Sequence, residues 1–296
     1  MKITEFPQVD NLIDGNVFLV DGPNGTKIVP VVSALLASAH LLSAEIHRMI
    51  FRGKNLGNKL TSEQLAHIQD GTFEDLWLGD YWKINNVIWR IVDFNYWMNS
   101  GDTALTKPHV LVMPDHALYN AQMNTSNTTT GAYTGSAMFT SNLAAARTAF
   151  KNAFGSAVIT HREIFTNATT NGYPSSGAWV DSYFDLANEI MMYGAYCHAP
   201  AGNGSTIPYR YTIDKTQLAL MMIVPKFINP HRENIWLRDV VSAADFANVN
   251  NNGNTNYNNA SNSNGGRPDF LTDQQKRRCC PFQLWKNDKA GRNLLR

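Results

Sequence analysis

Cysteine is scarce in this sequence, with only Cys197, Cys279 and Cys280 among 296 residues. Two adjacent cysteines rarely pair with each other because the bridge between them is strained. The spacing of the three provides neither a disulfide framework nor a set of metal ligands. We therefore expect a chain that folds without disulfide bridges, which is typical of assembly in the cytoplasm.

Long apolar runs and an excess of charge of either sign are also missing. The first residues, MKITEFPQVD, contain no apolar core of a secretory signal. No run approaches the roughly 18 apolar residues of a membrane span. Basic residues number 25 and acidic residues 24, which leaves a net charge of +1. We therefore expect neither nucleic acid as a partner nor insertion into a membrane, although basic residues gather in 272–296.

Apolar and aromatic residues, by contrast, are plentiful enough for a substantial core. Apolar residues make up 44% of the chain and aromatic residues 11%, with seven tryptophans and eleven tyrosines. Near the start, two short strands are predicted over 16–21 and 26–30, on either side of a turn. Apolar residues at three- and four-residue spacing then predict an amphipathic helix over 31–51. That helix either packs on its own domain or pairs with copies of itself in an oligomer.

From residue 52 onward, strands and helices are mixed. A capping-box pattern predicts a helical turn that starts near Thr61, and alternation around Asn85-Asn86 predicts a β-hairpin within 77–94. Asp185 and Glu189 stand at helical spacing and would lie on a solvated helix face. The remaining expected elements are strands at 109–114, 217–224, 235–238 and 267–271, helices at 141–154 and 182–193, and a loop at 124–140. Short strands around helices predict an α+β fold.

Asparagine dominates one segment near the C-terminus. Such tracts are often disordered. An ordered ribbon is favoured here because apolar residues such as Phe246 recur within it and because Trp236-Leu-Arg and Arg267-Pro-Asp-Phe-Leu flank it. Asparagine also suits turns, so we expect short strands and turns that display amide side chains. Ten of the seventeen positions from 248 to 264 are asparagine: Asn248, Asn250, Asn251, Asn252, Asn254, Asn256, Asn258, Asn259, Asn262 and Asn264.

The order of these motifs resembles a known family. Trp236-Leu-Arg, the asparagine-rich run and Gly266-Arg-Pro-Asp-Phe together resemble the C-terminus of C-type-lectin-like (formylglycine-generating-enzyme-like) domains. Such domains occur in phage tail proteins and in the variable proteins of diversity-generating retroelements. The hairpin that starts at Gly79-Asp-Tyr-Trp resembles the opening of that domain, and NVFLVDGPNGTK, from Asn16, is similar to the segment that precedes it in phage tail proteins of gut bacteria. The resemblance covers most of residues 10–271.

The resemblance implies a division of the chain into three parts. Residues 1–71 would form a small strand and helix segment for attachment or oligomerisation. Residues 72–271 would form a C-type-lectin-like ligand-binding domain with short strands, two helices and an irregular ribbon. Residues 272–296 form a basic tail that does not match the family. Gly266 also departs from the pattern, which has an apolar residue at that position.

The resemblance also implies a binding site whose side chains can be diversified. In the retroelement family, a reverse transcriptase randomises the adenines of a copied template, so asparagine codons come to encode almost any residue. The family's variable ligand-binding positions fall here on the ten asparagines, together with Asp245 and Tyr257. On a rigid scaffold, such exposed side chains change binding without refolding the backbone.

The function that the resemblance implies is receptor binding by a virion protein of a phage tail tip or fibre, made in the bacterial cytoplasm. The partner would be a host-cell surface receptor, either protein or glycan, and other virion proteins would contact residues 1–71. A homo-oligomer, by analogy with tail fibres a trimer, would multiply weak sites. One alternative is a structural virion protein whose ribbon contacts another subunit. Another is an enzyme of the formylglycine-generating type, which acts through cysteines that this chain does not match.

Few residues point to chemistry. His161-Arg-Glu and His231-Arg-Glu each place a histidine two residues from a glutamate, but isolated pairs are more typical of surface or hydrogen-bonded polar groups than of catalytic or metal sites. Asp239 and Asp245 do not make a convincing calcium site beside the ribbon. We therefore expect a binding protein rather than an enzyme, with no catalytic residue, metal or cofactor.

Overall fold

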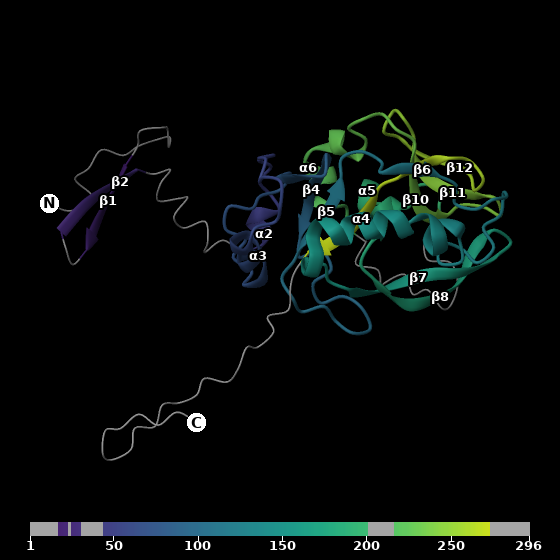
Figure 1. The fold of residues 1–296 in the computed structure, drawn as a ribbon, viewed down its shortest axis with the longest axis horizontal. Helices are drawn as coiled ribbons and strands as arrows, with labels where there is room; N and C mark the ends of the chain where they lie inside the picture. The colour runs from purple at the N-terminus through teal and green to yellow at the C-terminus, as the bar shows by residue number, and fades with distance from the viewer. Residues whose placement is uncertain (1–16, 23–24, 31–43, 201–215, 273–296) are drawn as a thin grey trace, which may run out of the picture.

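The computed structural model describes residues 17–22, 25–30, 44–200 and 216–272, which form helices and several β-sheets (Figure 1). This confirms the α+β class. Strands β1 (Val17–Gly22) and β2 (Gly25–Pro30) pair in antiparallel register, which confirms the two strands predicted there. Of the helix expected over 31–51, residues 31–43 lie outside the described residues. The described part is helical only in α2 (Ala44–His47), so the predicted end at Phe51 is wrong.

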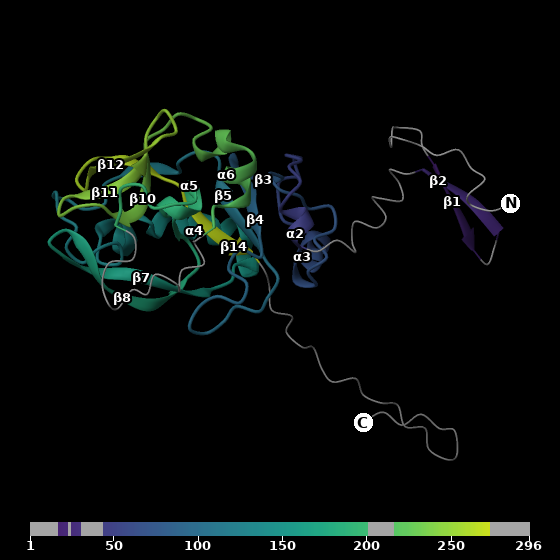
Figure 2. The same cartoon turned by 180° about the vertical axis from the view of Figure 1, so that it is seen from behind.

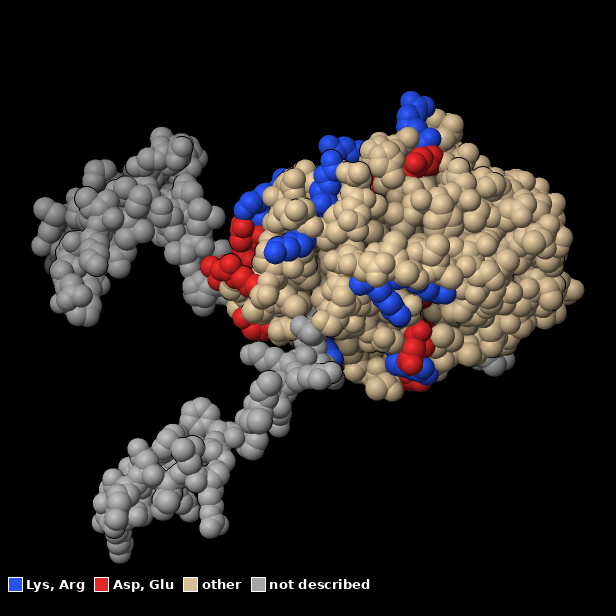
Figure 3. Space-filling model, viewed as in Figure 1, with Lys and Arg blue, Asp and Glu red and all other residues tan. Residues whose placement is uncertain are grey.

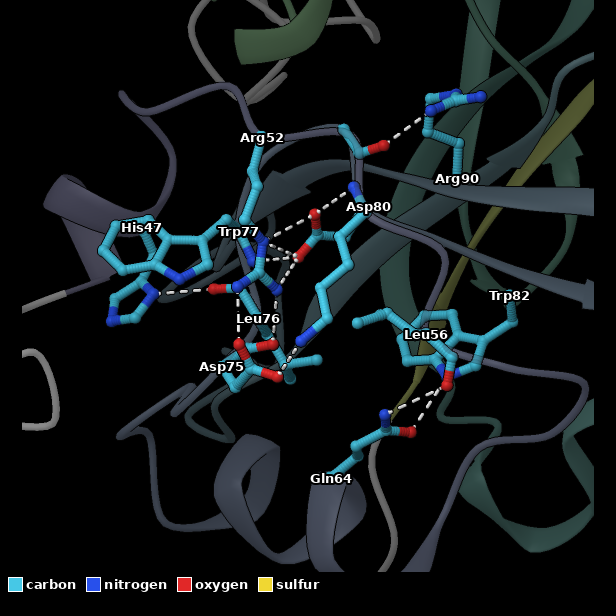
Figure 4. Close-up of polar contacts among 12 residues, drawn as sticks. His47, Arg52, Leu56, Gln64, Asp75, Leu76, Trp77, Asp80, Trp82 and Arg90 are labelled. Atoms are coloured by element: carbon cyan, nitrogen blue, oxygen red, sulfur yellow. Dashed lines mark hydrogen bonds and ion pairs between the residues drawn. The ribbon is translucent and has the colours of Figure 1, made fainter. Parts of the chain in front are cut away.

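The segment that follows α2 lies against strands β3 (Tyr81–Ile84) and β4 (Val87–Phe94), as Figure 4 shows. Arg52 donates hydrogen bonds to the buried carboxylate of Asp80 at 2.6–3.1 Å and to Asp75 at 2.5 Å. Asp80 also accepts hydrogen bonds from two backbone N–H groups, each at 2.8 Å. A buried carboxylate with this many donors fixes the segment on the sheet.

Helix α3 (Ser62–Gln69) begins where the sequence predicts. Thr61 Oγ1 accepts a hydrogen bond from the Gln64 backbone N–H at 3.1 Å, and the Gln64 side chain accepts one from the Thr61 N–H at 3.1 Å. Both halves of the capping box are therefore present. Gln64 Oε1 also accepts a hydrogen bond from the buried Trp82 indole at 2.9 Å, which ties the helix to β3 (Figure 4).

The hairpin predicted within 77–94 is confirmed as the β3–β4 pair. Its turn residues Asn85 and Asn86 have φ angles of 50° and 64°. Two successive residues with positive φ are the requirement of the type I′ turn, which asparagine tolerates better than most residues. The turn chemistry thus matches the right-handed twist of the strands that it joins.

Two five-stranded sheets make up most of the structure between β3 and residue 272 (Figures 1 and 2). The first has the strand order β3-β4-β5-β14-β9 and the second β12-β11-β10-β13-β6. Their remaining strands are β5 (Val110–Pro114), β6 (Tyr119–Ala121), β9 (Asp185–Leu186), β10 (Ile235–Val240), β11 (Asp245–Val249), β12 (Thr255–Asn259), β13 (Asn264–Gly266) and β14 (Pro268–Thr272). The strands predicted at 109–114, 235–238 and 267–271 correspond to β5, β10 and β14.

The helix predicted at 141–154 corresponds to α4 (Ala144–Phe154), which follows a π-helical turn over Met138–Asn142. Its buried Phe150 and Phe154 pack against Trp89 of β4 and Phe270 of β14, with ring centroids 3.6–6.1 Å apart. Interlocking aromatic rings of this kind bury large apolar areas. Helix α4 therefore covers one face of the first sheet.

The helix expected over 182–193 is wrong for most of its length. Strand β8 (Tyr173–Ser182) ends at its start, β9 follows, and only α5 (Glu189–Tyr193) is helical. The Asn188 side chain accepts a hydrogen bond from the Met191 N–H at 2.8 Å and so starts the helix late. Asp185 and Glu189 are buried, so the solvated helix face predicted for them is wrong as well.

The strand expected over 217–224 is also wrong, because this apolar run forms α6 (Ala219–Ile223) and a 3-10 turn, η6 (Pro225–Ile228). A short continuous apolar run does not distinguish a buried strand from a buried helix. Here a contact with a residue far away in the sequence favours the helix. The buried carboxylate of Asp93 on β4 accepts a hydrogen bond from the Ala219 N–H at 2.9 Å, at the helix N-terminus.

The longest hairpin of the described residues, formed by β7 (His161–Thr170) and β8, is not predicted by the sequence pattern. Its threonine, serine and glycine residues give little hydrophobic alternation. Most of β8 is only partly buried, so neither face carries the apolar pattern that marks a strand in a sequence.

The chain crosses from the second sheet to the first at Arg267, between β13 and β14. Gly265 and Gly266 allow close packing there, because a Cβ on Gly265 would lie 2.4 Å from that of Ala117 and one on Gly266 would lie 3.3 Å from the Tyr119 ring. The Tyr119 ring thus occupies the space beside Gly266, where the resembling family has an apolar side chain.

Three carboxyl groups are buried beside this crossing, on Glu163, Asp185 and Asp269. Arg238 is hydrogen-bonded to Glu163, and Tyr133 donates a hydrogen bond to Asp185 at 3.0 Å. Burial raises the pKa of Asp185 above its ordinary value and that of Asp269 well above it, because a charged carboxylate is poorly solvated there. Burial therefore shifts the equilibrium of Asp269 toward its protonated form relative to the unfolded chain.

We expect Asp269→Asn to weaken the pH dependence of stability. Because the pKa of Asp269 is higher in the folded chain than in the unfolded chain, the folded state binds the proton more tightly. This contribution is fully present below about pH 4, the unfolded value, and is lost as the pH rises through the folded pKa. Asparagine keeps the neutral shape with no proton to lose. The free energy of unfolding in urea should therefore fall less between pH 4 and pH 8 in the variant than in the wild type.

The exposed substitution Thr148→Ala on α4, which changes no ionisable group, is the control and should leave the pH profile close to that of the wild type. An Asp269→Asn profile as steep as the wild-type profile would show that Asp269 is not the group that titrates.

Candidate functional site

The asparagine-rich segment forms an ordered hairpin at the edge of the second sheet. Strands β11 and β12 pair in continuous antiparallel register, from Asp245 with Asn259 to Val249 with Thr255. Phe246, Ala247 and Val249 are buried, as is Ala260 just beyond β12. These apolar residues hold the backbone to the core, which accounts for order in a segment of such composition.

Asparagine side chains build the turn between the strands. Asn250 Oδ1 accepts hydrogen bonds from the backbone N–H groups of Asn252 and Asn254, at 2.9 and 3.1 Å. The Asn250 N–H donates to the Asn254 carbonyl at 2.9 Å, and the Gly253 N–H to the Asn250 carbonyl at 2.9 Å. Gly253 has a φ of +86°, which other residues rarely adopt. Asn250 is therefore a structural residue of the turn.

Residues outside the hairpin hold the same turn. The Asn229 side chain donates a hydrogen bond to the Asn250 carbonyl at 2.6 Å, and Asn234 Oδ1 accepts one from the Asn251 N–H at 3.0 Å. The hydroxyl of Tyr193, at the end of α5, donates to the Gly253 carbonyl at 3.0 Å. The turn is thus fixed to α5 and to the loop before β10.

Glu189 holds the start of β12. Its buried carboxylate accepts a hydrogen bond from Thr255 Oγ1 at 3.1 Å and from the N–H groups of Cys197, His198 and Ala199 at 2.9–3.2 Å. These contacts bring the His198 ring to 5.1 Å from the ring of Tyr257 on β12. This role of Glu189 could not be predicted from the sequence, because its carboxylate binds two separate segments, 197–199 and the start of β12.

The twelve predicted site residues lie together on this hairpin, on the loop that follows and, for Asn264, at the start of β13, but they differ in exposure. Five are exposed, five are half-buried and two are buried. The exposed residues are Asn251, Asn252, Asn254, Tyr257 and Asn262. The half-buried residues are Asp245, Asn250, Asn256, Asn258 and Asn259. The buried residues are Asn248 and Asn264.

The two buried asparagines do not present their amides to the surface. Asn248 Oδ1 and Asn264 Nδ2 find no hydrogen-bond partner among the described residues. A buried polar atom without a partner costs about 1–3 kcal/mol. Polarity at these positions is therefore not explained by packing.

The half-buried Asp245 and Asn259 are bound to each other across the strand pair. Asn259 Nδ2 donates to Asp245 Oδ1 at 2.9 Å, and Ser242 Oγ donates to Asp245 Oδ2 at 2.5 Å. The Asp245 carboxylate is thus occupied by partners within the chain. The rest of the hairpin contributes no charged side chain, because no Asp, Glu, Lys or Arg occurs from 246 to 266. Arg232, from the loop before β10, lies beside the turn and donates a hydrogen bond to Asn252 Oδ1 at 3.2 Å.

The charge distribution of the molecule agrees with this. On the face shown in Figure 3, the right-hand end, where β11 and β12 lie in Figure 1, is largely free of basic and acidic side chains, whereas charged groups gather toward α2 and α3. An uncharged surface of amides and hydroxyl groups binds by hydrogen bonding and packing, and it exerts little long-range attraction on ions.

The histidine pairs of the sequence lie elsewhere. His161 is buried, stacks on Trp97 with ring centroids 4.4 Å apart, and lies 3.3 Å from Glu163. His231 stacks on His116, and burial lowers the pKa of His231. Among the residues that the structure describes, no group of three or more His, Cys, Asp or Glu could hold a metal ion.

Comparison with known proteins gives no relative of this chain: no family model matches it, and no curated protein or solved structure is significantly similar. Within the described ranges, no helix has the length and apolar character needed to cross a membrane.

We expect Asn250→Ala to loosen the turn while Asn254→Ala does not. The first substitution removes the acceptor of two backbone hydrogen bonds and should lower the free energy of unfolding by about 1–2 kcal/mol. It should also speed amide hydrogen exchange at residues 252 and 254. The exposed Asn254 side chain makes none of these contacts, so its loss should cost less than about 0.5 kcal/mol. Equal effects of the two substitutions would contradict the role assigned to Asn250.

Proposed function

We propose that this chain is a receptor-binding protein of a phage virion, at the tail tip or fibre, and that the exposed face of the β11–β12 hairpin and the 260–264 loop is its binding surface. One observation carries the proposal. The backbone of the hairpin is fixed by buried apolar residues and by internal hydrogen bonds, while Asn251, Asn252 and Asn254 project from it. Side chains can therefore change at these positions without loss of the fold.

The proposal includes a C-type-lectin-like fold for residues 72–271. Short strands, mixed helices and an irregular hairpin framed by β10 and β14 support it. The first and last strands of the proposed domain, β3 and β14, belong to one sheet, so the domain closes on itself. The resemblance of motif order remains the source of the family assignment.

Attachment to the virion is proposed for residues 1–71, together with assembly into a homo-oligomer. Exposed apolar side chains support this at one end of the molecule. Met49 and Met222 are 68% and 57% exposed, and Ile50 and Ile223 are also exposed. Phe51 and Phe227 have ring centroids 5.7 Å apart, which joins the segment after α2 to η6. Apolar groups of this size in water are typical of protein contact surfaces.

The binding proposal predicts that Asn251→Ala, Asn252→Ala, Asn254→Ala and Asn262→Ala, combined in one chain, abolish attachment to host cells and leave the fold intact. The four side chains are exposed, so the thermal midpoint should shift by only a few degrees. A pull-down on cells and a melting curve measure the two effects. Thr148→Ala with Asn152→Ala, two exposed polar residues of α4, is the matched control.

Each outcome of this experiment decides the proposal. Attachment equal to that of the wild type would reject the hairpin as receptor site. If virions that carry the variant then failed to assemble, the hairpin would belong to a structural contact between subunits. A variant that failed to fold would reject the idea that these exposed side chains can change without loss of the fold.

Diversification of the hairpin makes a prediction about gene sequences. A near-identical copy of the coding sequence for residues 245–264 and a reverse-transcriptase gene should lie near this gene. Among diversified copies, Asn251, Asn252, Asn254 and Asn262 should vary widely. The buried Asn248 should vary less, because most larger or charged side chains would not fit there. Equal variation at exposed and buried positions would contradict the structural argument.

A further inference from the structure

Charged residues make up 17% of the sequence, but several long stretches contain no Asp, Glu, Lys or Arg, and three of these stretches are rich in Asn, Ser, Thr and Gly. They are residues 117–146, 164–180 and 246–266. The first includes NTSNTTTGAYTG from Asn124, and the second includes TNATTNGYPSSG from Thr166. Both have the small, amide- and hydroxyl-bearing composition of the hairpin itself.

Hydrogen bonds bring the first stretch to the hairpin. Asn127 Oδ1 accepts hydrogen bonds from the N–H and Oγ of Ser261, at 3.2 and 2.5 Å. The Asn124 N–H donates to the Ala260 carbonyl at 2.9 Å. The loop at 124–130 therefore continues the surface of β12 beyond its C-terminal end.

The second stretch joins the same loop. Thr169 Oγ1 donates a hydrogen bond to the Thr129 carbonyl at 3.2 Å. Thr129 Oγ1 in turn donates to the Ser242 carbonyl at 2.7 Å, just before β11. Gly172, in the β7–β8 turn, lies so close to Ala243 that a Cβ there would be 2.1 Å from the Ala243 nitrogen. The β7–β8 turn, the 124–130 loop and the hairpin thus meet at one end of the molecule (Figures 1 and 2).

We infer that the exposed parts of 124–130, 166–173 and 250–263 form one recognition surface, the neutral surface, which binds an uncharged polysaccharide of the host cell. The inference rests on the proposed receptor-binding function and names its ligand class. It extends the site to two segments in which the sequence analysis placed no binding residue.

The chemistry of the exposed groups selects this ligand. Amides and hydroxyl groups both donate and accept hydrogen bonds, as sugar hydroxyls do. Tyr173 and Tyr257 are 49% and 48% exposed and are the large hydrophobic residues exposed on the described part of this surface. A tyrosine ring offers an apolar face with a polar end, which suits the C–H face of a sugar.

Other ligand classes fit the surface less well. An acidic polysaccharide is normally held by several Lys or Arg residues. None occurs in the three segments, and Arg232, which borders them, donates a hydrogen bond to Asn252 Oδ1 at 3.2 Å. A protein partner is normally held by a central cluster of apolar, aromatic and Arg residues. Two separate tyrosines among small polar residues do not provide such a cluster.

The first experiment measures attachment of the full-length protein to host cells treated in two ways. Periodate, which cleaves sugar diols, should reduce attachment at least about tenfold, and protease should not. Because no charge pair is involved, attachment should change less than about twofold between roughly 0.05 and 0.5 M NaCl. Attachment that is lost after protease but not after periodate, or that falls steeply with salt, would overturn the inference.

The second experiment tests the extent of the surface. Thr125→Ala with Ser126→Ala, and separately Thr170→Ala with Tyr173→Ala, remove exposed hydroxyl groups and one ring. Each double variant should bind polysaccharide extracted from those cells about tenfold more weakly than the wild type, as expected for the loss of about one hydrogen bond per residue. Thr148→Ala with Asn152→Ala should bind as the wild type does.

The outcomes distinguish failure of the wider surface from failure of the proposed function. Wild-type binding by both double variants, while the four-asparagine hairpin variant has lost attachment, would overturn the wider surface and leave the proposed function standing. Wild-type attachment by the hairpin variant as well would remove the proposed function itself.

Discussion

The hydrogen bonds of the Arg267 side chain fix the two sheets relative to each other. Its guanidinium is fully buried at the crossing from β13 to β14 and donates hydrogen bonds to the carbonyls of Pro114, Phe227 and Ile228, at 2.7–3.0 Å. Burial lowers the pKa of Arg267 to about 10, so the group is still charged at neutral pH. Removal of a buried charge that carries several hydrogen bonds leaves its acceptors unsatisfied, which is far more costly than loss of a surface pair. The end of β5, the η6 turn and both C-terminal strands are therefore fixed relative to one another by one side chain.

The hairpin inherits its position from this crossing. Strand β13 pairs with β10 in parallel through Ile235 and Gly265, and β10 pairs with β11 in antiparallel register. The buried Trp236 of β10 also donates a hydrogen bond to the Ala121 carbonyl at 2.9 Å, which ties the centre of the sheet to β6. The hairpin thus forms the outer edge of a sheet whose position is fixed by contacts of its other strands. Substitutions on its outer face change few contacts of that frame, so its stability and its surface chemistry are separable.

Caps and turns that depend on neighbouring residues could be predicted from the sequence. Elements that depend on contacts between distant residues could not. The capping box at Thr61 and the Asn85-Asn86 turn depend on residues a few positions apart, so their patterns are complete in the sequence. Helix α6 depends on Asp93, which is 126 positions away from Ala219 along the chain. The same limit applies to the site. Composition located the hairpin, but burial of Asn248 follows from how β11 packs on the core, and no neighbour in the sequence reveals it.

The distribution of charge shows how such a limit can be partly overcome. Absence of charge in three stretches is visible in the sequence, but each stretch alone would be interpreted as a polar loop. Contacts such as Asn127 with Ser261 and Thr169 with Thr129 show that the three stretches meet at one end of the molecule. Most protein surface carries charged residues because they favour solubility. A large surface without them, built from rigid strands and hydrogen-bonded turns, gives up that advantage. The fold itself requires some of these residues, such as Asn250 in the turn and Gly172 against Ala243. For the exposed side chains of all three stretches, we propose that recognition of an uncharged, hydroxyl-rich ligand accounts for the shared composition.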